Sequence, residues 1–174
     1  MAFLQFVSAL LLYCKQVHKL SEAGIGLLPG LNGLIVFLFE MLTVYILEKK
    51  YKPESLIITG TLLLAASFAL MNIYPTIADL YLAMLIMSFS EIFTMPFMIS
   101  FAVRRATEKT RGSHIGFYSL GWYIAFILTP FTSTLIISKW TYTILWWVVT
   151  AFCLITALLF YFLLRLKPKN LNQY

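Results

Sequence analysis

Apolar residues fill most of the chain in six long runs, which are separated by short connections that carry charges or proline. A helix of about 20 apolar residues crosses the hydrocarbon layer of a membrane, which is about 30 Å thick. The runs cover residues 2–14, 24–47, 56–74, 80–103, 113–137 and 144–164. The pattern therefore predicts an all-α membrane protein with one transmembrane domain over residues 1–174.

The first run is too short to span the membrane. At 1.5 Å per residue, residues 2–14 form a helix of about 20 Å. We interpret this run as the outer part of a helix whose beginning is missing or abbreviated. Ser21 followed by Glu22 is typical of a helix start, so the second helix is expected to begin there.

Composition excludes a soluble protein. Hydrophobic residues make up 61% of the 174 residues, charged residues only 11%, and the mean hydropathy is +0.87. The net charge of +6 comes from lysines and arginines that lie between the apolar runs. We interpret these charges as signals of membrane orientation and not as a nucleic-acid site.

The distribution of lysine and arginine predicts the orientation. If both termini are cytoplasmic, ten of these residues lie inside and three outside, as expected from the excess of positive charge on the cytoplasmic side. The inner set is Lys49, Lys50, Lys52, Arg104, Arg105, Lys109, Arg111, Arg165, Lys167 and Lys169, and the outer set is Lys15, Lys19 and Lys139.

An acidic residue, Glu91, lies near the middle of the fourth run. Insertion of such a residue costs about 3 kcal/mol, which the surrounding Leu, Ile, Phe and Val residues offset at about 0.3 to 0.6 kcal/mol each. Ionisable residues inside a membrane usually mark a site or pathway. Burial favours the uncharged form of a carboxylic acid, which would allow Glu91 to bind and release a proton.

The residues three, four and seven positions from Glu91 share its helix face. They are Met84, Met87, Ser88, Thr94, Met95 and Met98, so four of the seven methionines lie on this face. Methionine is common at surfaces that bind ligands of varied shape, but it also fills gaps between packed helices. The pattern alone leaves both interpretations open.

The second run contains another acidic residue, Glu40, together with Asn32 and several small residues. Gly26, Pro29 and Gly33 share a narrow stripe with Glu40, which would let another helix approach closely. The second and fifth runs both carry glycine and proline, whereas the third and sixth are plainly apolar. This arrangement is typical of two three-helix repeats of opposite topology.

Other kinds of chemistry are disfavoured. Cys14 and Cys153 lack the spacing of a disulfide framework or metal site, and no cofactor is indicated. His18 and His114 lie apart near the predicted membrane surfaces, which argues against an enzyme. The cytoplasmic connections of about eight or nine residues leave no room for helices that dock a nucleotide-binding subunit.

Three stretches resemble the C-terminal six-helix half of the major facilitator superfamily, and in particular its bacterial drug–proton antiporters. LSEAGIGLLPGLNGLIVFLFE (residues 20–40) is similar to the entry of the family's eighth helix, and SFSEIFTMP (residues 88–96) to its tenth. TRGSHIGFYSLGW (residues 110–122) is similar to the start of its eleventh. The chain departs from the family in Thr129-Pro130, where Gly-Pro is usual, and in the loop Glu48 to Lys52, which lacks the usual glycines. On this resemblance, the chain is expected to lack the family's first six helices.

The resemblance implies helices seven to twelve of such a transporter, a 3+3 inverted repeat and alternating access. It implies proton-coupled efflux of amphipathic or drug-like compounds at a bacterial inner membrane. Proton binding is assigned to Glu91, with Glu40 as a second candidate. Candidates for the substrate cavity are Met84, Met87, Ser88, Met95 and Asn32, and candidates for the inner gate are Arg111 and Gly112.

Two other functions stay open at this stage. One is an uptake carrier for a small polar metabolite, although the chain offers few converging hydrogen-bonding groups. The other is a half-size or non-catalytic membrane subunit. In every case a partner is expected to cover the face that carries the acidic residues, either an N-terminal transporter half or a second copy of the chain.

Overall fold

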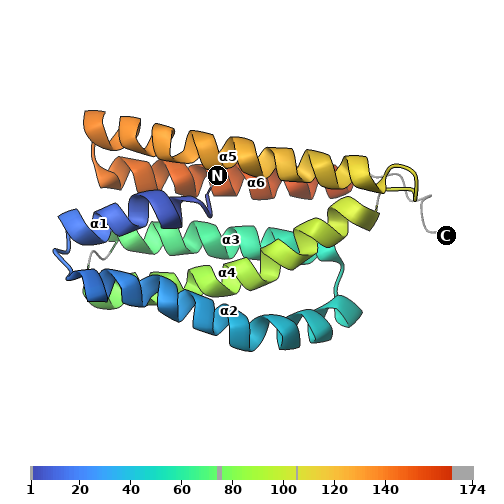
Figure 1. Ribbon diagram of the computed structural model, residues 1–174, viewed down its shortest axis with the longest axis horizontal. Helices are drawn as coiled ribbons and strands as arrows, with labels where there is room; N and C mark the ends of the chain where they lie inside the picture. The colour runs from blue at the N-terminus through green and yellow to red at the C-terminus, as the bar shows by residue number, and fades with distance from the viewer. Residues whose placement is uncertain (1, 74–75, 105, 166–174) are drawn as a thin grey trace.

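The computed structural model describes residues 2–73, 76–104 and 106–165, and in these ranges the chain is helical without strands. The elements are a π-helical segment η1 (Phe6–Leu10), α1 (Leu11–Gln16), α2 (Glu22–Lys50), α3 (Pro53–Ile73), α4 (Ile77–Arg104), α5 (Arg111–Lys139) and α6 (Tyr142–Arg165). They lie side by side in one bundle (Figure 1). Five of them, α2 to α6, are long and apolar enough to cross a membrane.

The long helices contain the predicted apolar runs and extend one to three residues beyond them at most ends. Polar residues at a membrane surface continue the backbone hydrogen bonding of a helix, so apolarity alone marks its ends too early. Ser21 is the N-cap of α2, and its hydroxyl accepts a hydrogen bond of 3.3 Å from the Gly24 amide, which confirms the predicted start. The predicted end of the third run, Tyr74, lies outside the described residues.

The first helix, η1 and α1 together, is short. It begins about half-way along the bundle and ends beside the start of α2 (Figure 1). We call the end of the bundle at which α1 and α5 finish the Lys139 end, and the opposite end, at which α2 and α4 finish, the Arg104 end. The first helix therefore fills only the half of the bundle next to the Lys139 end.

The main hydrophobic core lies between α1, α3, α4 and α6. Phe68 of α3 stacks on Trp146 of α6 with ring centroids 5.5 Å apart, and Tyr13 meets the same indole edge-on at 5.5 Å. Met84 and Met87 of α4 are also buried in this core. These contacts fix the half of the bundle at the Lys139 end.

Helices α3 and α4 make the most extensive contact in the bundle. Gly60 allows close approach, because a side chain there would overlap the Thr94 hydroxyl. The Ser90 hydroxyl donates a hydrogen bond of 2.6 Å to the Gly60 carbonyl, and the Ser67 hydroxyl donates one of 2.7 Å to Ala83. Small residues and hydroxyl bonds of this kind hold helices together in an apolar medium.

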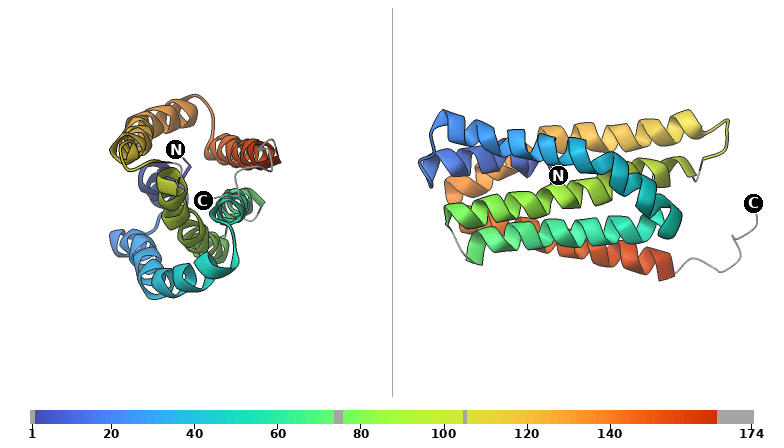
Figure 2. Two further views of the ribbon diagram at one scale, coloured as in Figure 1. Left: turned by 90° about the vertical axis from the view of Figure 1, so that its right-hand side faces the viewer. Right: turned by 90° about the horizontal axis from the view of Figure 1, so that it is seen from below.

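The long helices differ in how far the bundle buries them. In the most apolar part of each helix, 44% of residues are buried in α3 and α4, 17% in α5 and none in α2. Figure 2 shows α3 and α6 on one side of the bundle, α5 and the first part of α2 on the other, and α4 between them. Most of α2 and α5 therefore faces the open side of this chain, and the residues of α5 that are buried are Ala125, Thr129 and Ser133.

Proline interrupts neither α4 nor α5. A proline usually kinks or breaks a helix, but α5 is continuous from Arg111 to Lys139 through Pro130, which is exposed. The adjacent hydroxyls bind backbone carbonyls, Thr129 to Ala125 and Ser133 to Thr129, each at 2.6 Å. In α4 the axis bends toward α5 in its second half (Figure 1), the part that contains Pro96.

Candidate functional site

Three of the predicted site residues form one hydrogen-bonded group between α2 and α4. The Asn32 side-chain amide donates to Glu91 Oε2 at 3.1 Å. The Ser88 hydroxyl donates to Asn32 Oδ1 at 2.6 Å and also lies 3.0 Å from the Met84 carbonyl. Ser88 is fully buried, and Asn32 and Glu91 are partly buried. We call Asn32, Ser88 and Glu91 the polar triad.

Helical geometry explains the triad. Ser88 and Glu91 are three residues apart, so their side chains project from the same face of α4 on successive turns. Asn32 lies in the half of α2 nearer the Lys139 end, and its short amide reaches both residues at once. The group sits in the middle of α4, with 14 residues before Glu91 and 13 after it in the helix Ile77–Arg104. The carboxylate is therefore far from both helix ends.

The methionines on the Glu91 face of α4 divide into two groups. Met84 and Met87 are 3% exposed and pack in the core, so they offer no surface to a substrate in this conformation. Met95 is partly buried on the same face of α4, and Met98 lines an opening closer to the Arg104 end. The interpretation as gap-filling residues therefore fits Met84 and Met87. A cavity role for Met95 stays a prediction, and Met98, which was not among the cavity candidates, lines the opening.

Glu40 lies apart from the triad, eight residues after Asn32 in α2. Its side chain is partly buried and makes no hydrogen bond or ion pair with any described residue. A methyl group added at Gly26 or Gly33, on the same stripe, would meet nothing within 4 Å. The stripe that was predicted to admit a close helix is open in this chain.

The gate candidates Arg111 and Gly112 begin α5 at the Arg104 end, where both are exposed. No described contact connects them to the triad. The neighbouring connection from α4 is organised by Thr107 and Thr110, whose hydroxyls lie 2.9 Å apart. Across the same end of the bundle, Arg104 and Glu48 form an exposed ion pair of 3.4 Å between α4 and α2.

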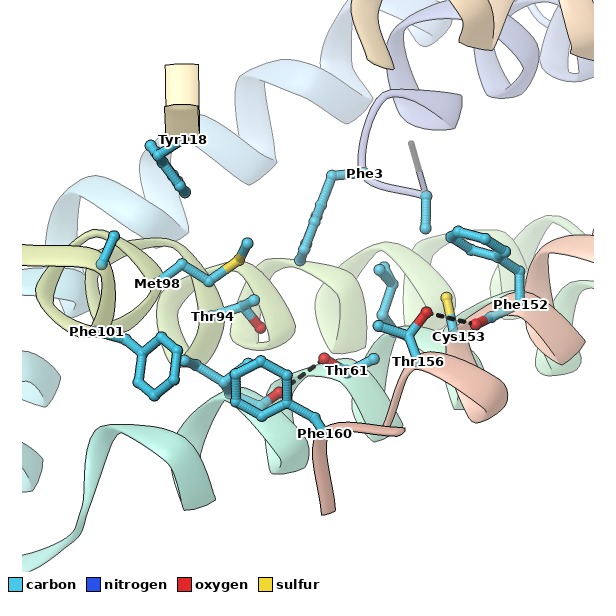
Figure 3. A pocket seen from close by; sticks show the side chains of 14 residues that line it. Phe3, Thr61, Thr94, Met98, Phe101, Tyr118, Phe152, Cys153, Thr156 and Phe160 are labelled. Atoms are coloured by element: carbon cyan, nitrogen blue, oxygen red, sulfur yellow. Dashed lines mark hydrogen bonds between the residues drawn. The ribbon is translucent and has the colours of Figure 1, made fainter. Parts of the chain in front are cut away.

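An apolar slot of about 280 Å³ opens on the Arg104 side of the triad (Figure 3). Its walls come from the start of the chain and from α3, α4, α5 and α6, and they are Ala2, Phe3, Ile57, Thr61, Leu64, Thr94, Met98, Phe101, Ala102, Tyr118, Phe152, Cys153, Thr156 and Phe160. The hydroxyls of Thr61 and Thr156 donate hydrogen bonds of 2.7 Å to backbone carbonyls of their own helices. The Thr94 hydroxyl is buried and has no partner among the described residues.

Sequence reasoning missed the slot and a second polar contact. Gln5 and Ser133, both buried, form a hydrogen bond of 2.7 Å between the start of the chain and α5. A glutamine inside an apolar run was the available signal for this contact, but its partner lies 128 positions away. The slot depends on side chains from five segments and has no local sequence signal.

The described residues contain no group of three or more His, Cys, Asp or Glu side chains placed to hold a metal ion. Cys14 and Cys153 are buried and unpaired. No curated protein and no solved structure matches the chain. The family model of the Major Facilitator Superfamily matches residues 1–173. Together with the apolar helices, this match identifies the chain as an integral membrane protein that belongs to the Major Facilitator Superfamily, a superfamily of membrane transporters.

Proposed function

We propose that the chain is one half of a proton-coupled secondary transporter in which Glu91 binds the proton. The observation that carries the proposal is the position of Glu91, in the middle of α4 and hydrogen-bonded to Asn32. A lysine or arginine beside the carboxylate would hold it ionised, whereas a neutral amide permits both charge states. The basic residues of the described helices lie near helix ends, not beside the triad.

The slot supports an amphipathic or drug-like substrate. Thr94, three residues after Glu91, is its nearest polar wall residue along α4, and aromatic rings form much of the rest (Figure 3). Ligand sites of this kind are mostly apolar with a few placed polar groups. A compound with a largely apolar body fits these walls better than a small polar metabolite does.

The partner in this proposal covers the open faces of α2 and α5. Phe37 and Met41 of α2 are about four-fifths exposed, beside the unpaired Glu40. Apolar side chains alone are satisfied by lipid, but a carboxylate in a span needs protein or water around it. We infer that an N-terminal transporter half, in the same longer chain or a separate one, or a second copy, lies there.

In this proposal the chain forms an inverted repeat of two three-helix sets. The first set is η1/α1, α2 and α3, and the second is α4, α5 and α6. α2 and α5 are the middle helices of the two sets. Both contain proline and glycines with no neighbour within 4 Å of an added methyl group, and both are less buried than α3 and α4. The Arg104 end carries most of the lysines and arginines, so in this proposal it faces the cytoplasm at a bacterial inner membrane, as does the end of α6. This chain and its partner half rock relative to each other about the triad and the slot, which gives alternating access.

Transport of ethidium, an amphipathic cation, tests this function. Everted membrane vesicles are prepared from source cells that express the protein from its native locus, so its partner is present. An imposed proton gradient drives ethidium uptake by the unaltered protein, and Glu91→Gln abolishes it. Glu40→Gln, a matched change in a second acidic residue, retains most of the uptake. Undiminished gradient-driven uptake by Glu91→Gln contradicts the role of Glu91, and no uptake by the unaltered protein contradicts the substrate class.

A further inference from the structure

We propose that Asn32 is the positioning residue for proton binding, and that its side-chain amide turns over when Glu91 takes up a proton. The inference rests on the proposed proton-binding role of Glu91 and adds how the protein accommodates both charge states. Its basis is the pair of hydrogen bonds that join Asn32 to Glu91 and Ser88 across α2 and α4.

With Glu91 ionised, the direction of each bond is fixed by chemistry. A carboxylate only accepts, so the Asn32 group that faces Glu91 Oε2 at 3.1 Å must be the donating Nδ2. Oδ1 then faces Ser88, whose hydroxyl donates to it at 2.6 Å. The chain of donation runs from Ser88 to Asn32 to Glu91. This is the arrangement in the structure.

With Glu91 protonated, the same atoms can be satisfied in the opposite direction. In this proposal the proton is on Oε2, the oxygen that faces Asn32, where it would point at an Nδ2 that also donates and would leave one of the two donors without an acceptor. Rotation of the amide by half a turn places Oδ1 toward Glu91 and Nδ2 toward the Ser88 oxygen. The Ser88 hydrogen then goes to the Met84 carbonyl, which already lies 3.0 Å from the hydroxyl. The two states differ in composition only by the added proton: the O–H bond of Glu91 is the one covalent bond formed, while the hydrogen bonds of Asn32 and Ser88 are exchanged.

Asparagine is suited to this position because its amide offers a donor and an acceptor of nearly equal shape. Leucine offers neither group, and aspartate would add a second negative charge beside the first. Unpaired polar groups in an apolar interior are costly, so a proton on the oxygen that faces Asn32 favours a partner whose hydrogen bonds can reverse. The Met84 carbonyl completes the site, since it receives the hydrogen that Asn32 no longer accepts.

Other ionisable groups on the packed helices do not replace this role. α4 packs against α2, α3 and α5. The ionisable side chain of α3 is Glu54, near its Arg104 end, and those of α5 are Arg111, His114, Tyr118, Tyr123 and Lys139. On α2 the acidic residue nearest to Asn32 is Glu40, and α4 itself carries Asp79, Tyr81 and Arg104 besides Glu91. No described hydrogen bond or ion pair joins any of them to the Glu91 carboxylate.

One consequence is mechanical. A hydrogen bond joins Asn32 to Glu91 in either orientation of the amide, so α2 stays tied to α4 whether or not the proton is bound. Among the described elements, α2 contacts mainly α4, with a smaller contact to α1. α2 is therefore expected to move together with α4 during transport and not independently of it.

Nuclear magnetic resonance of the side-chain amides tests the inference. The protein is isolated with its native partner and labelled with ¹⁵N-asparagine; this chain has four asparagines, and loss of one pair of signals in Asn32→Leu assigns Asn32. We expect the Asn32 amide signals to shift between alkaline and acid pH, and the shift to be lost in Glu91→Gln. Asn72 is an internal control, because its amide donates to the Thr143 backbone carbonyl at 3.2 Å, which does not titrate.

The outcomes separate the inference from the proposed function. If Glu91→Gln abolishes gradient-driven ethidium uptake but the Asn32 signals do not change with pH, the inference is wrong and the role of Glu91 stands. If Glu91→Gln transports normally, the proposed function is wrong whatever the Asn32 signals do. Ser88→Ala gives a second test that keeps both Asn32 and Glu91. It removes the acceptor for the turned amide, so the pH-dependent shift is expected to shrink, and an unchanged shift overturns the reversal.

Discussion

Gly60→Ala is expected to destabilise the protein through a single close contact between α3 and α4. The added methyl group would overlap the Thr94 hydroxyl and lie 3.0 Å from the Ser90 carbonyl oxygen. One obstacle is the backbone of α4, which cannot rotate away as a flexible side chain can. The two helices must therefore separate, and the 2.6 Å bond from the Ser90 hydroxyl to the Gly60 carbonyl is strained as well.

The loss of stability follows from two destabilising effects and one stabilising effect. Overpacking of a buried contact costs about 1 to 3 kcal/mol. A weakened interhelical hydrogen bond inside a membrane protein adds about 0.6 kcal/mol. Alanine in place of glycine favours a helix by about 1 kcal/mol. The net loss is about 0.6 to 2.6 kcal/mol, which corresponds to a decrease in melting temperature of about 2 to 8 °C for a chain of this size.

Thermal unfolding in detergent, followed by tryptophan fluorescence, measures this loss, because Trp146 is buried in the core against Phe68. Gly30→Ala is the matched control, since a methyl group there meets nothing within 4 Å. Adding Thr94→Ala to Gly60→Ala removes the overlapping hydroxyl and should recover part of the stability. An unchanged melting temperature in Gly60→Ala, or a double variant no more stable than the single one, would refute the contact argument.

Three further predictions concern other contacts. Gly33→Leu should leave the melting temperature of the isolated chain unchanged, because an added side chain meets nothing there. It should reduce the mass of the native assembly in light scattering, because the partner covers this stripe. An unchanged mass would contradict the covered stripe. Ser133→Ala should lower the melting temperature more than Gln5→Leu does. The first leaves the buried Gln5 amide oxygen without its donor, whereas the second leaves the Ser133 hydroxyl bonded to the Thr129 carbonyl at 2.6 Å; equal losses would argue against that asymmetry. Glu48→Gln should have no measurable thermal effect, because both partners of its ion pair with Arg104 are more than half exposed.

The sequence predicted the helices well because the signal for them is local. Membrane thickness requires long apolar runs, and charged residues mark their limits, so five spans could be located within a few residues. Ser21 could also be identified as a helix start because an N-cap depends on its immediate neighbours. The continuity of α5 through Pro130 could not be predicted, because it depends on the hydrogen bonds that the neighbouring hydroxyls make to backbone carbonyls.

The site was only partly predictable. Helical spacing placed Ser88 beside Glu91, but nothing in the sequence shows that Asn32 reaches both from α2, because that depends on how two helices pack. Spacing also grouped Met84 and Met87 with Glu91, although part of that helix face turns into the core. Burial of those two residues is decided by α3 and α6, which the periodicity of α4 cannot reveal.

Infrared difference spectroscopy tests the central claim, that Glu91 binds the coupling proton, most directly. Spectra of the protein with its native partner in lipid are recorded at acid and alkaline pH, and a protonated carboxylic acid has a carbonyl band that its ionised form lacks. The account predicts an acid-dependent band that Glu91→Gln removes and Glu40→Gln retains. A band that persists unchanged in Glu91→Gln would contradict the account and show that another residue binds the proton.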